Sequence, residues 1–238
     1  MPGCRMSREP THGRSESTIR AGGLIGGLVP VLVMGALLLG SSGDPVWLMA
    51  WVYLGIHAGA TAVLAVTIHP GLIEERSARR PGAKRWDRRL VPILWALGSL
   101  TLVVAGQDHR YHWTAPFPVS VQVGALAVFV IGYAIVILAG VSNEFFSGIV
   151  RIQEERGHHV ISTGPYAQVR HPGYLGLLLC LGSEPMLFSS FWALIPGGLT
   201  VGLLVLRTYL EDQTLRRELN GYPEYCSRVP FRLVPGIW

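Results

Sequence analysis

The sequence predicts an all-α integral membrane protein of about six transmembrane helices, the last two of which form a short hairpin. Charged residues make up 15% of the 238 residues, whereas an ordinary globular protein has about 25%. The basic residues behind the net charge of +5 lie between long apolar runs. We therefore expect the lipid bilayer as a partner, and no nucleic acid.

The apolar runs are long enough to define the spans, since a transmembrane helix needs about 20 mostly apolar residues. Four runs each predict one spanning helix: 21–40, 46–68, 90–106 and 119–141. The first run is too long for the core of a cleaved signal peptide, so we expect an uncleaved span.

A fifth apolar run, 174–206, has 33 residues, which is too long for one span and short for two. Gly182-Ser183-Glu184-Pro185 interrupts it. We expect a hairpin of two short helices with this break at its tip, where Glu184 would reach the outer headgroups.

Lysine and arginine are distributed unevenly along the predicted bundle. Nineteen of the 20 lie in the two tails, the loop 76–89 and the segment 142–173, and only Arg110 lies on the other side. Because cytoplasmic loops carry the excess of basic residues, we expect a multi-pass protein with both termini cytoplasmic. The chain then divides into a polar tail (1–20), a four-helix transmembrane region (21–141) and a cytoplasm-facing C-terminal region with the hairpin (142–238).

The first polar segment that could carry chemistry precedes the hairpin. Gly157 is expected to end a continuation of the fourth spanning helix, and Thr163-Gly164-Pro165-Tyr166 is a turn signal. Pro172 suits the first position of a helix, which makes His171 its N-cap. The free N–H groups at such a helix start favour an anion.

The second polar segment, 207–221, follows the hairpin. Arg207 and Glu211 have the i,i+4 spacing that places them on one helix face. They form either a surface ion pair worth a few tenths of a kcal/mol or a functional pair where the last span ends, and composition alone favours the ion pair. The three cysteines are widely spaced, and we predict no metal site.

Together these segments resemble a known family. The pattern Gly164-Pro165-Tyr166, Arg170-His171-Pro172-Gly173-Tyr174, Arg207-x3-Glu211-Asp212 and Gly221-Tyr222 is similar to that of the isoprenylcysteine carboxyl methyltransferases, to which membrane phospholipid methyltransferases are related. The resemblance covers roughly residues 140–238, and the upstream spans match only in hydropathy.

The resemblance implies an integral-membrane methyltransferase that uses S-adenosyl-L-methionine as its cofactor and methylates a lipophilic acceptor, with a carboxylate favoured. Arg207 would be the catalytic, substrate-binding arginine, and Glu211 would bind the cofactor. The other implied cofactor contacts are Gln153, His158, His159, Val160, Ile161, Tyr166, His171, Pro172, Gly173 and Tyr174. The chain departs from the family pattern at Asp212, where a longer acidic residue is common, and by a small length change after Gln153.

The residue types agree with this implication. The helix start at His171 suits the carboxylate of S-adenosylmethionine, Glu211 suits its ammonium or ribose hydroxyls, and Tyr166 and Tyr174 offer aromatic faces. Methyl transfer needs positioning and desolvation more than acid–base help.

Three alternatives remain open at this stage. The first is a membrane reductase of the sterol-reductase type, which uses NADPH, and the second is a phospholipid N-methyltransferase. The third is a membrane protein without catalysis. A prenylated thioether, an ethanolamine lipid amine and a small lipophilic acid all fit the composition as acceptors, and the oligomeric state is left open.

Overall fold

The computed structural model describes residues 15–77 and 82–238, and the regular structure within these ranges is helical. The α-helices are α1 (Glu16–Ser42), α2 (Leu48–Thr67), α3 (Pro70–Ser77), α4 (Arg85–Tyr111), α5 (Val119–Ser142), α6 (Pro172–Leu187), α7 (Leu194–Glu218) and α8 (Tyr222–Arg228). Most of the predicted tail 1–20, and Arg79 and Arg80 of the basic loop, lie outside the described residues. The all-α prediction is confirmed for the rest.

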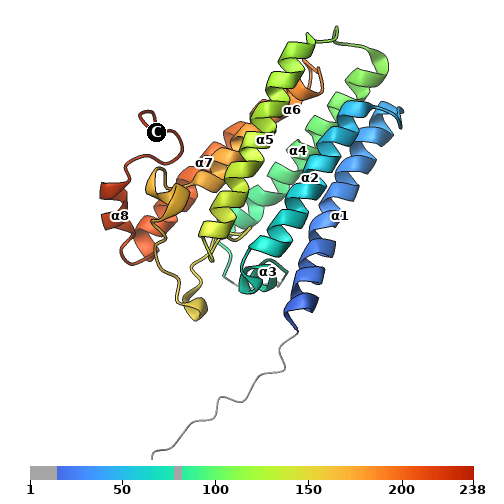
Figure 1. Cartoon of the computed structure of the whole chain (residues 1–238). Helices are drawn as coiled ribbons and strands as arrows, with labels where there is room; N and C mark the ends of the chain where they lie inside the picture. The colour runs from blue at the N-terminus through green and yellow to red at the C-terminus, as the bar shows by residue number, and fades with distance from the viewer. Residues whose placement is uncertain (1–14, 78–81) are drawn as a thin grey trace, which may run out of the picture.

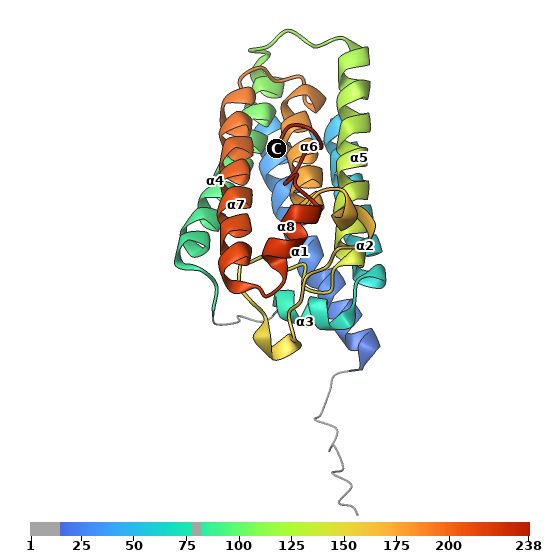
Figure 2. The ribbon, with the colours of Figure 1, turned by 90° about the vertical axis from the view of Figure 1, so that its left-hand side faces the viewer.

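The long helices form an elongated bundle in which successive helices run in opposite directions (Figures 1 and 2). Five of the described helices are long and apolar enough to cross a membrane: α1, α2, α4, α5 and α7. The other long element of the bundle, α6, has 16 residues and so spans about 24 Å at 1.5 Å per residue. The multi-pass prediction holds, with five candidate spans and one shorter helix beside them.

The predicted position of the hairpin break is wrong. Helix α6 continues through Gly182–Pro185 to Leu187, and the turn follows it. Ser189 has a positive φ of 58°, and the N–H of Ser190 donates to the carbonyl of Pro185 at 2.9 Å. These contacts close the turn four to five residues later than expected.

Glu184 does not reach the outer headgroups, which corrects a second expectation. Its side chain is 4% exposed, and the hydroxyl of Tyr53 on α2 donates to its Oε1 at 2.9 Å. Because a buried acidic group needs a hydrogen-bond partner, the tyrosine explains how this polar residue remains inside a helix rather than in a loop.

Gly157 does not end an extension of the fourth spanning helix, so this third expectation from the sequence is also wrong. Helix α5 stops at Ser142, after which the side chain of Asn143 accepts from the N–H of Phe145 at 2.8 Å. Gly157 instead closes a single 3-10 turn, Glu154–Arg156, with a φ of 67°. The segment between α5 and α6 is therefore a long loop, with a second 3-10 turn at Gly164–Ala167. The predicted N-cap at His171 and first helical position at Pro172 are confirmed.

Helices α5 and α6 approach each other closely. A Cβ atom added to Gly176 would lie 2.5 Å from the carbonyl oxygen of Gly132. Glycine at both positions lets the two backbones pack directly, and this packing places the first turn of α6 next to the loop that follows α5. The candidate site is built at that junction.

Candidate cofactor site

A cavity of about 580 Å³ lies where the loop 143–171 meets the start of α6 and the second half of α7. Its volume falls within the range of about 300–1,000 Å³ that is typical of small-molecule sites. The cavity also reaches side chains within the bundle, from α1, α4, α5 and α6: Pro30, Trp95, Val136 and Leu177. One continuous space thus joins a polar wall to an apolar interior.

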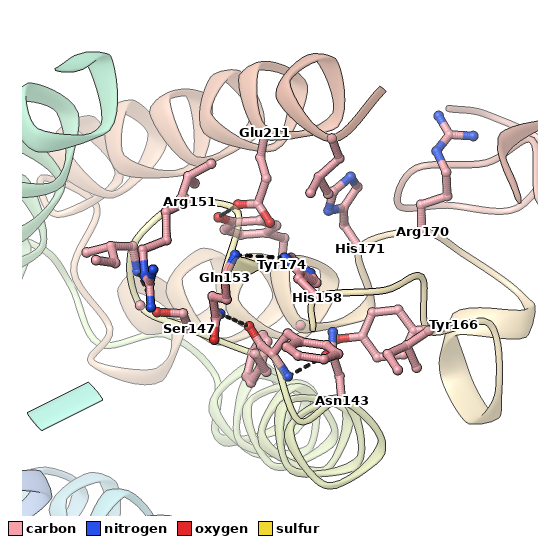
Figure 3. A pocket seen from close by; sticks show the side chains of 18 of the residues that line it. Asn143, Ser147, Arg151, Gln153, His158, Tyr166, Arg170, His171, Tyr174 and Glu211 are labelled. Atoms are coloured by element: carbon pink, nitrogen blue, oxygen red, sulfur yellow. Dashed lines mark hydrogen bonds between the residues drawn. The ribbon is translucent and has the colours of Figure 1, made fainter. Parts of the chain in front are cut away.

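The structure brings together nearly all of the residues that the sequence singled out. Those that line the cavity are Gln153, His158, His159, Val160, Ile161, Tyr166, His171, Gly173, Tyr174, Arg207 and Glu211. Pro172 does not line the cavity; it is buried as the first residue of α6. Figure 3 shows Glu211 and Tyr174 on the opposite side of the space from Asn143 and Tyr166.

Glu211 and Tyr174 form the centre of the polar wall. The hydroxyl of Tyr174 on α6 donates to Oε2 of Glu211 on α7. The guanidinium of Arg207 lies over the Tyr174 ring, 5.4 Å from its centroid. Within the described residues Glu211 makes no salt bridge, so its carboxylate faces the cavity with a neutral hydrogen-bond partner.

Arg207 is not part of a surface ion pair with Glu211, which corrects the interpretation that composition favoured. Its side chain is buried, and its Nε donates to Oδ1 of Asp87 at 2.8 Å. Its Nη2 donates to the carbonyl of Gly148, also at 2.8 Å. The arginine is therefore held from two sides.

Asp87 is the main residue that sequence reasoning missed. It lies fully buried in the first turn of α4, and its second oxygen accepts from the N–H of Val150 at 2.8 Å. One carboxylate thus ties together α4, α7 and the loop between α5 and α6. The only local signal is a single acidic residue in the run Arg85-Trp-Asp-Arg-Arg89, which also fits a loop at the membrane surface.

The loop that forms the outer wall is held by its own polar groups. Gln153 is 1% exposed; its amide donates to the carbonyl of Phe145 at 2.9 Å and accepts from Arg156. The ring of His158 packs on that of Phe145, with 4.5 Å between centroids. Burial, with smaller effects of nearby charges, lowers the pKa of His158 to about 4, so its ring is neutral at pH 7.

A buried ion pair anchors this loop to α3. Arg151 donates through Nε and Nη2 to the two oxygens of Glu75, at 2.8 Å each. Hydrogen bonds to Glu75 and Glu155 raise the pKa of Arg151 above its ordinary value. A bidentate pair of this kind fixes orientation as well as distance, so the loop is positioned relative to the bundle.

Asp212, next to Glu211 in the sequence, has a different environment. It is fully buried and accepts from the side chains of Arg170, Tyr222 and His171 at 2.8, 3.1 and 3.4 Å. It therefore ties the start of α6 to α8 and the C-terminal segment. The hydroxyl of Tyr225 adds a bond to the carbonyl of Tyr166 at 2.6 Å.

Comparison with known proteins bears on the same region. Residues 125–217 match the isoprenylcysteine carboxyl methyltransferase (ICMT) family. The resemblance drawn from the sequence motifs is thereby confirmed. The ICMT match includes α6, nearly all of α7 and the loop between α5 and α6, which supply most of the cavity lining.

Two curated proteins are similar to parts of the chain. A Delta(14)-sterol reductase (TM7SF2) of Mus musculus is 30% identical over 109 residues, which is 41% of this chain and 24% of the reductase. Protein-S-isoprenylcysteine O-methyltransferase B of Arabidopsis thaliana is 29% identical over 87 residues, 36% of this chain and 44% of the methyltransferase. The chain thus spans less than half the length of either relative.

Proposed function

We propose that this protein is an integral-membrane methyltransferase that transfers a methyl group from S-adenosyl-L-methionine to a lipophilic acceptor. The observation that carries the proposal is the cavity, because its polar wall comes from the ICMT-matching region while its other end reaches Pro30 and Trp95 within the spanning helices. A water-soluble cofactor and a lipid-dissolved acceptor can meet in such a space.

The residues on the polar wall fit this cofactor. S-adenosylmethionine has an ammonium and a sulfonium, and Glu211 offers a carboxylate without a salt bridge in the described chain. Gly173 and Tyr174, in the first turn of α6, line the cavity, and the free backbone N–H groups of a helix start suit a carboxylate. A Cβ at Gly173 would lie 2.5 Å from the ring of Phe146, so glycine lets Phe146 pack against the first turn of α6.

When bound, the cofactor supplies a methyl group on a sulfonium centre. Arg207 would orient the acceptor, because Nε and Nη2 are occupied by Asp87 and Gly148 while Nη1 has no hydrogen-bond partner among the described residues. A carboxylate acceptor is ionised at pH 7 and needs no base. Asp87 would act as a positioning residue that fixes the direction of Nη1.

We also propose six spans with both termini on the cytoplasmic side, with α6 crossing as a short helix paired to α7. The alternating helix directions and the 19-to-1 distribution of basic residues support this. Reporter fusions after Gly43, Trp113 and Gly157 should lie outside, outside and inside. An outside Gly157 would separate the cavity from cytoplasmic cofactor and overturn the topology.

The function is tested with the purified full chain in lipid nanodiscs. S-adenosylhomocysteine should bind in calorimetry, and radiolabelled S-adenosylmethionine should label one of three offered acceptors: a prenylated cysteine analogue, an ethanolamine phospholipid or a lipophilic acid. Glu211→Gln should weaken S-adenosylhomocysteine binding, whereas Gln213→Asn, on the same helix, should not. Absence of binding at millimolar ligand would refute the proposal.

A second candidate is a reductase, favoured by the similarity to the mouse sterol reductase over 41% of the chain. The same nanodiscs distinguish the two functions. A reductase should bind NADPH and oxidise it in the presence of a sterol with a suitable double bond. A methyltransferase should bind S-adenosylhomocysteine and leave NADPH unchanged.

A further inference from the structure

Three arginines converge on the single buried carboxylate of Asp212. Arg170 donates to it from the start of α6, Arg216 from one turn further along α7 and Arg232 from the C-terminal segment, at 2.8, 3.0 and 2.9 Å. One negative charge therefore faces three positive charges. The cluster has an excess of positive charge that Asp212 does not neutralise.

Two of these arginines have open hydrogen-bonding groups. Arg170 is buried and uses Nη1 on the carbonyls of Val229 and Pro230. Arg216 and Arg232 each bind the same oxygen of Asp212 through Nε. In the described part of the chain their Nη1 and Nη2 groups have no hydrogen-bond acceptor. The side chains are 38% and 18% exposed, and neither lines the cavity.

The open groups lie beside apolar and aromatic surface. The guanidinium of Arg232 packs on Tyr209 and on Trp238, 5.7 and 5.0 Å from the ring centroids. Tyr209 is on the outer face of α7, and Ile237 is 81% exposed. Aromatic and basic side chains meet in this way where a membrane protein contacts lipid headgroups.

We propose that Arg216 and Arg232 form a site for the phosphate of an anionic phospholipid in the leaflet at this end of the bundle. Two neighbouring guanidiniums with free Nη groups suit the paired oxygens of a phosphate. The acyl chains would lie along the exposed apolar residues of α7. Neither arginine lines the cavity, and the site does not depend on methyl transfer.

The experiment uses the full chain in mixed micelles and measures bound lipid by native mass spectrometry. Wild type should retain phosphatidylglycerol in preference to phosphatidylcholine. Because charge-assisted contacts to the phosphate would be lost, Arg216→Gln with Arg232→Gln should reduce this preference by about tenfold. Arg217→Gln is the matched control, since it removes the same charge from an exposed neighbour on α7 and should leave the preference unchanged.

Two further arms keep the test decisive. Arg216→Gln alone leaves Asp212 with two arginines and should reduce the preference several-fold. This single variant keeps the test valid if the double variant does not fold. Inorganic phosphate at the same concentration should not displace the lipid. Equal retention by wild type and both Arg216 variants, or displacement by inorganic phosphate, would overturn the proposal.

Discussion

The two ends of the helical bundle both bury carboxylates but supply them with different partners. At the end away from the cavity, Asp108 accepts from the backbone and hydroxyl of Thr114 at 2.7 Å each and from the hydroxyl of Ser190 at 2.6 Å. At the cavity end, Asp87 and Asp212 are bound by arginines. Neutral donors alone bind Asp108, whereas Asp87 and Asp212 also have arginines as counter-charges.

The two kinds of hydrogen-bond partner correspond to two roles of a buried carboxylate. Asp108 joins the loop after α4 to the turn after α6 through hydrogen bonds from neutral donors alone. Asp87 holds a cation in a fixed place beside a cavity, and removing one partner of such a pair leaves an uncompensated charge. The cavity end should therefore be more sensitive to substitution, in stability and in activity.

The largest effect is expected for Asp87→Asn. The change leaves Arg207 buried without its counter-charge, which typically costs about 3–5 kcal/mol, and it releases the direction of Nη1. We expect a large fall in the thermal unfolding temperature in detergent, and loss of methyl transfer even where the protein is folded.

Glu218→Gln is the control for this substitution, because it breaks an exposed salt bridge with Lys84 near the same end. Exposed pairs contribute about 0–1 kcal/mol, so this variant should resemble wild type. Equal unfolding temperatures for Asp87→Asn and Glu218→Gln would show that the buried pair contributes no more to stability than the exposed pair.

The next effect separates Arg207 from Glu211. Loss of a charge-assisted contact costs about 1.5–3 kcal/mol, or roughly 10- to 150-fold. Glu211→Gln should mainly raise the KM for S-adenosylmethionine. Arg207→Gln also leaves Asp87 buried without its counter-charge, but in the folded fraction it should mainly impair use of the acceptor and leave S-adenosylhomocysteine binding nearly intact. If both variants lose only affinity for the cofactor, Arg207 positions Glu211 and Tyr174 and does not bind the acceptor.

Asp108→Asn should have a smaller effect, confined to stability. Its amide can still accept through one oxygen, but its N–H₂ faces hydroxyl groups that previously donated, so we expect a loss of about 1–2 kcal/mol. S-adenosylhomocysteine affinity should be unchanged in calorimetry. A change in affinity would mean that the two ends are coupled and the comparison fails.

The smallest effect is a pH dependence at the cavity end. His158 has a pKa of about 4 in the folded loop, below its ordinary value of 6.5. Below pH 6.5 the unfolded loop therefore takes up a proton that the folded loop excludes, so the folded loop loses stability as the pH falls toward 4. S-adenosylhomocysteine affinity should decrease from pH 7 to pH 5.

A pair of neighbouring substitutions isolates this dependence. His158→Gln should flatten the pH profile of S-adenosylhomocysteine affinity, since its side chain does not titrate. His159→Gln, at an exposed position, should keep the wild-type slope. A wild-type slope in both variants would assign the dependence to another group.

Much of the fold follows from local sequence. The apolar runs at 46–68 and 119–141 correspond closely to α2 and α5, because a spanning helix needs length and hydrophobicity that a single segment supplies by itself. The start of α6 could also be predicted from neighbouring residues alone, because proline at a first helical position has no N–H to leave unpaired. Eleven of the residues that line the cavity could also be named from motifs within 153–211.

Tertiary structure decided the rest. Gly182–Pro185 looks like a break until Tyr53, 131 residues away from Glu184 in the chain, provides the hydroxyl that keeps this acid inside α6. Arg207 and Glu211 look like an ion pair until Asp87, 120 residues before Arg207, takes the arginine. A residue's neighbours along a helix are fixed by spacing, but the partner that satisfies a buried charge is chosen by which helices pack together.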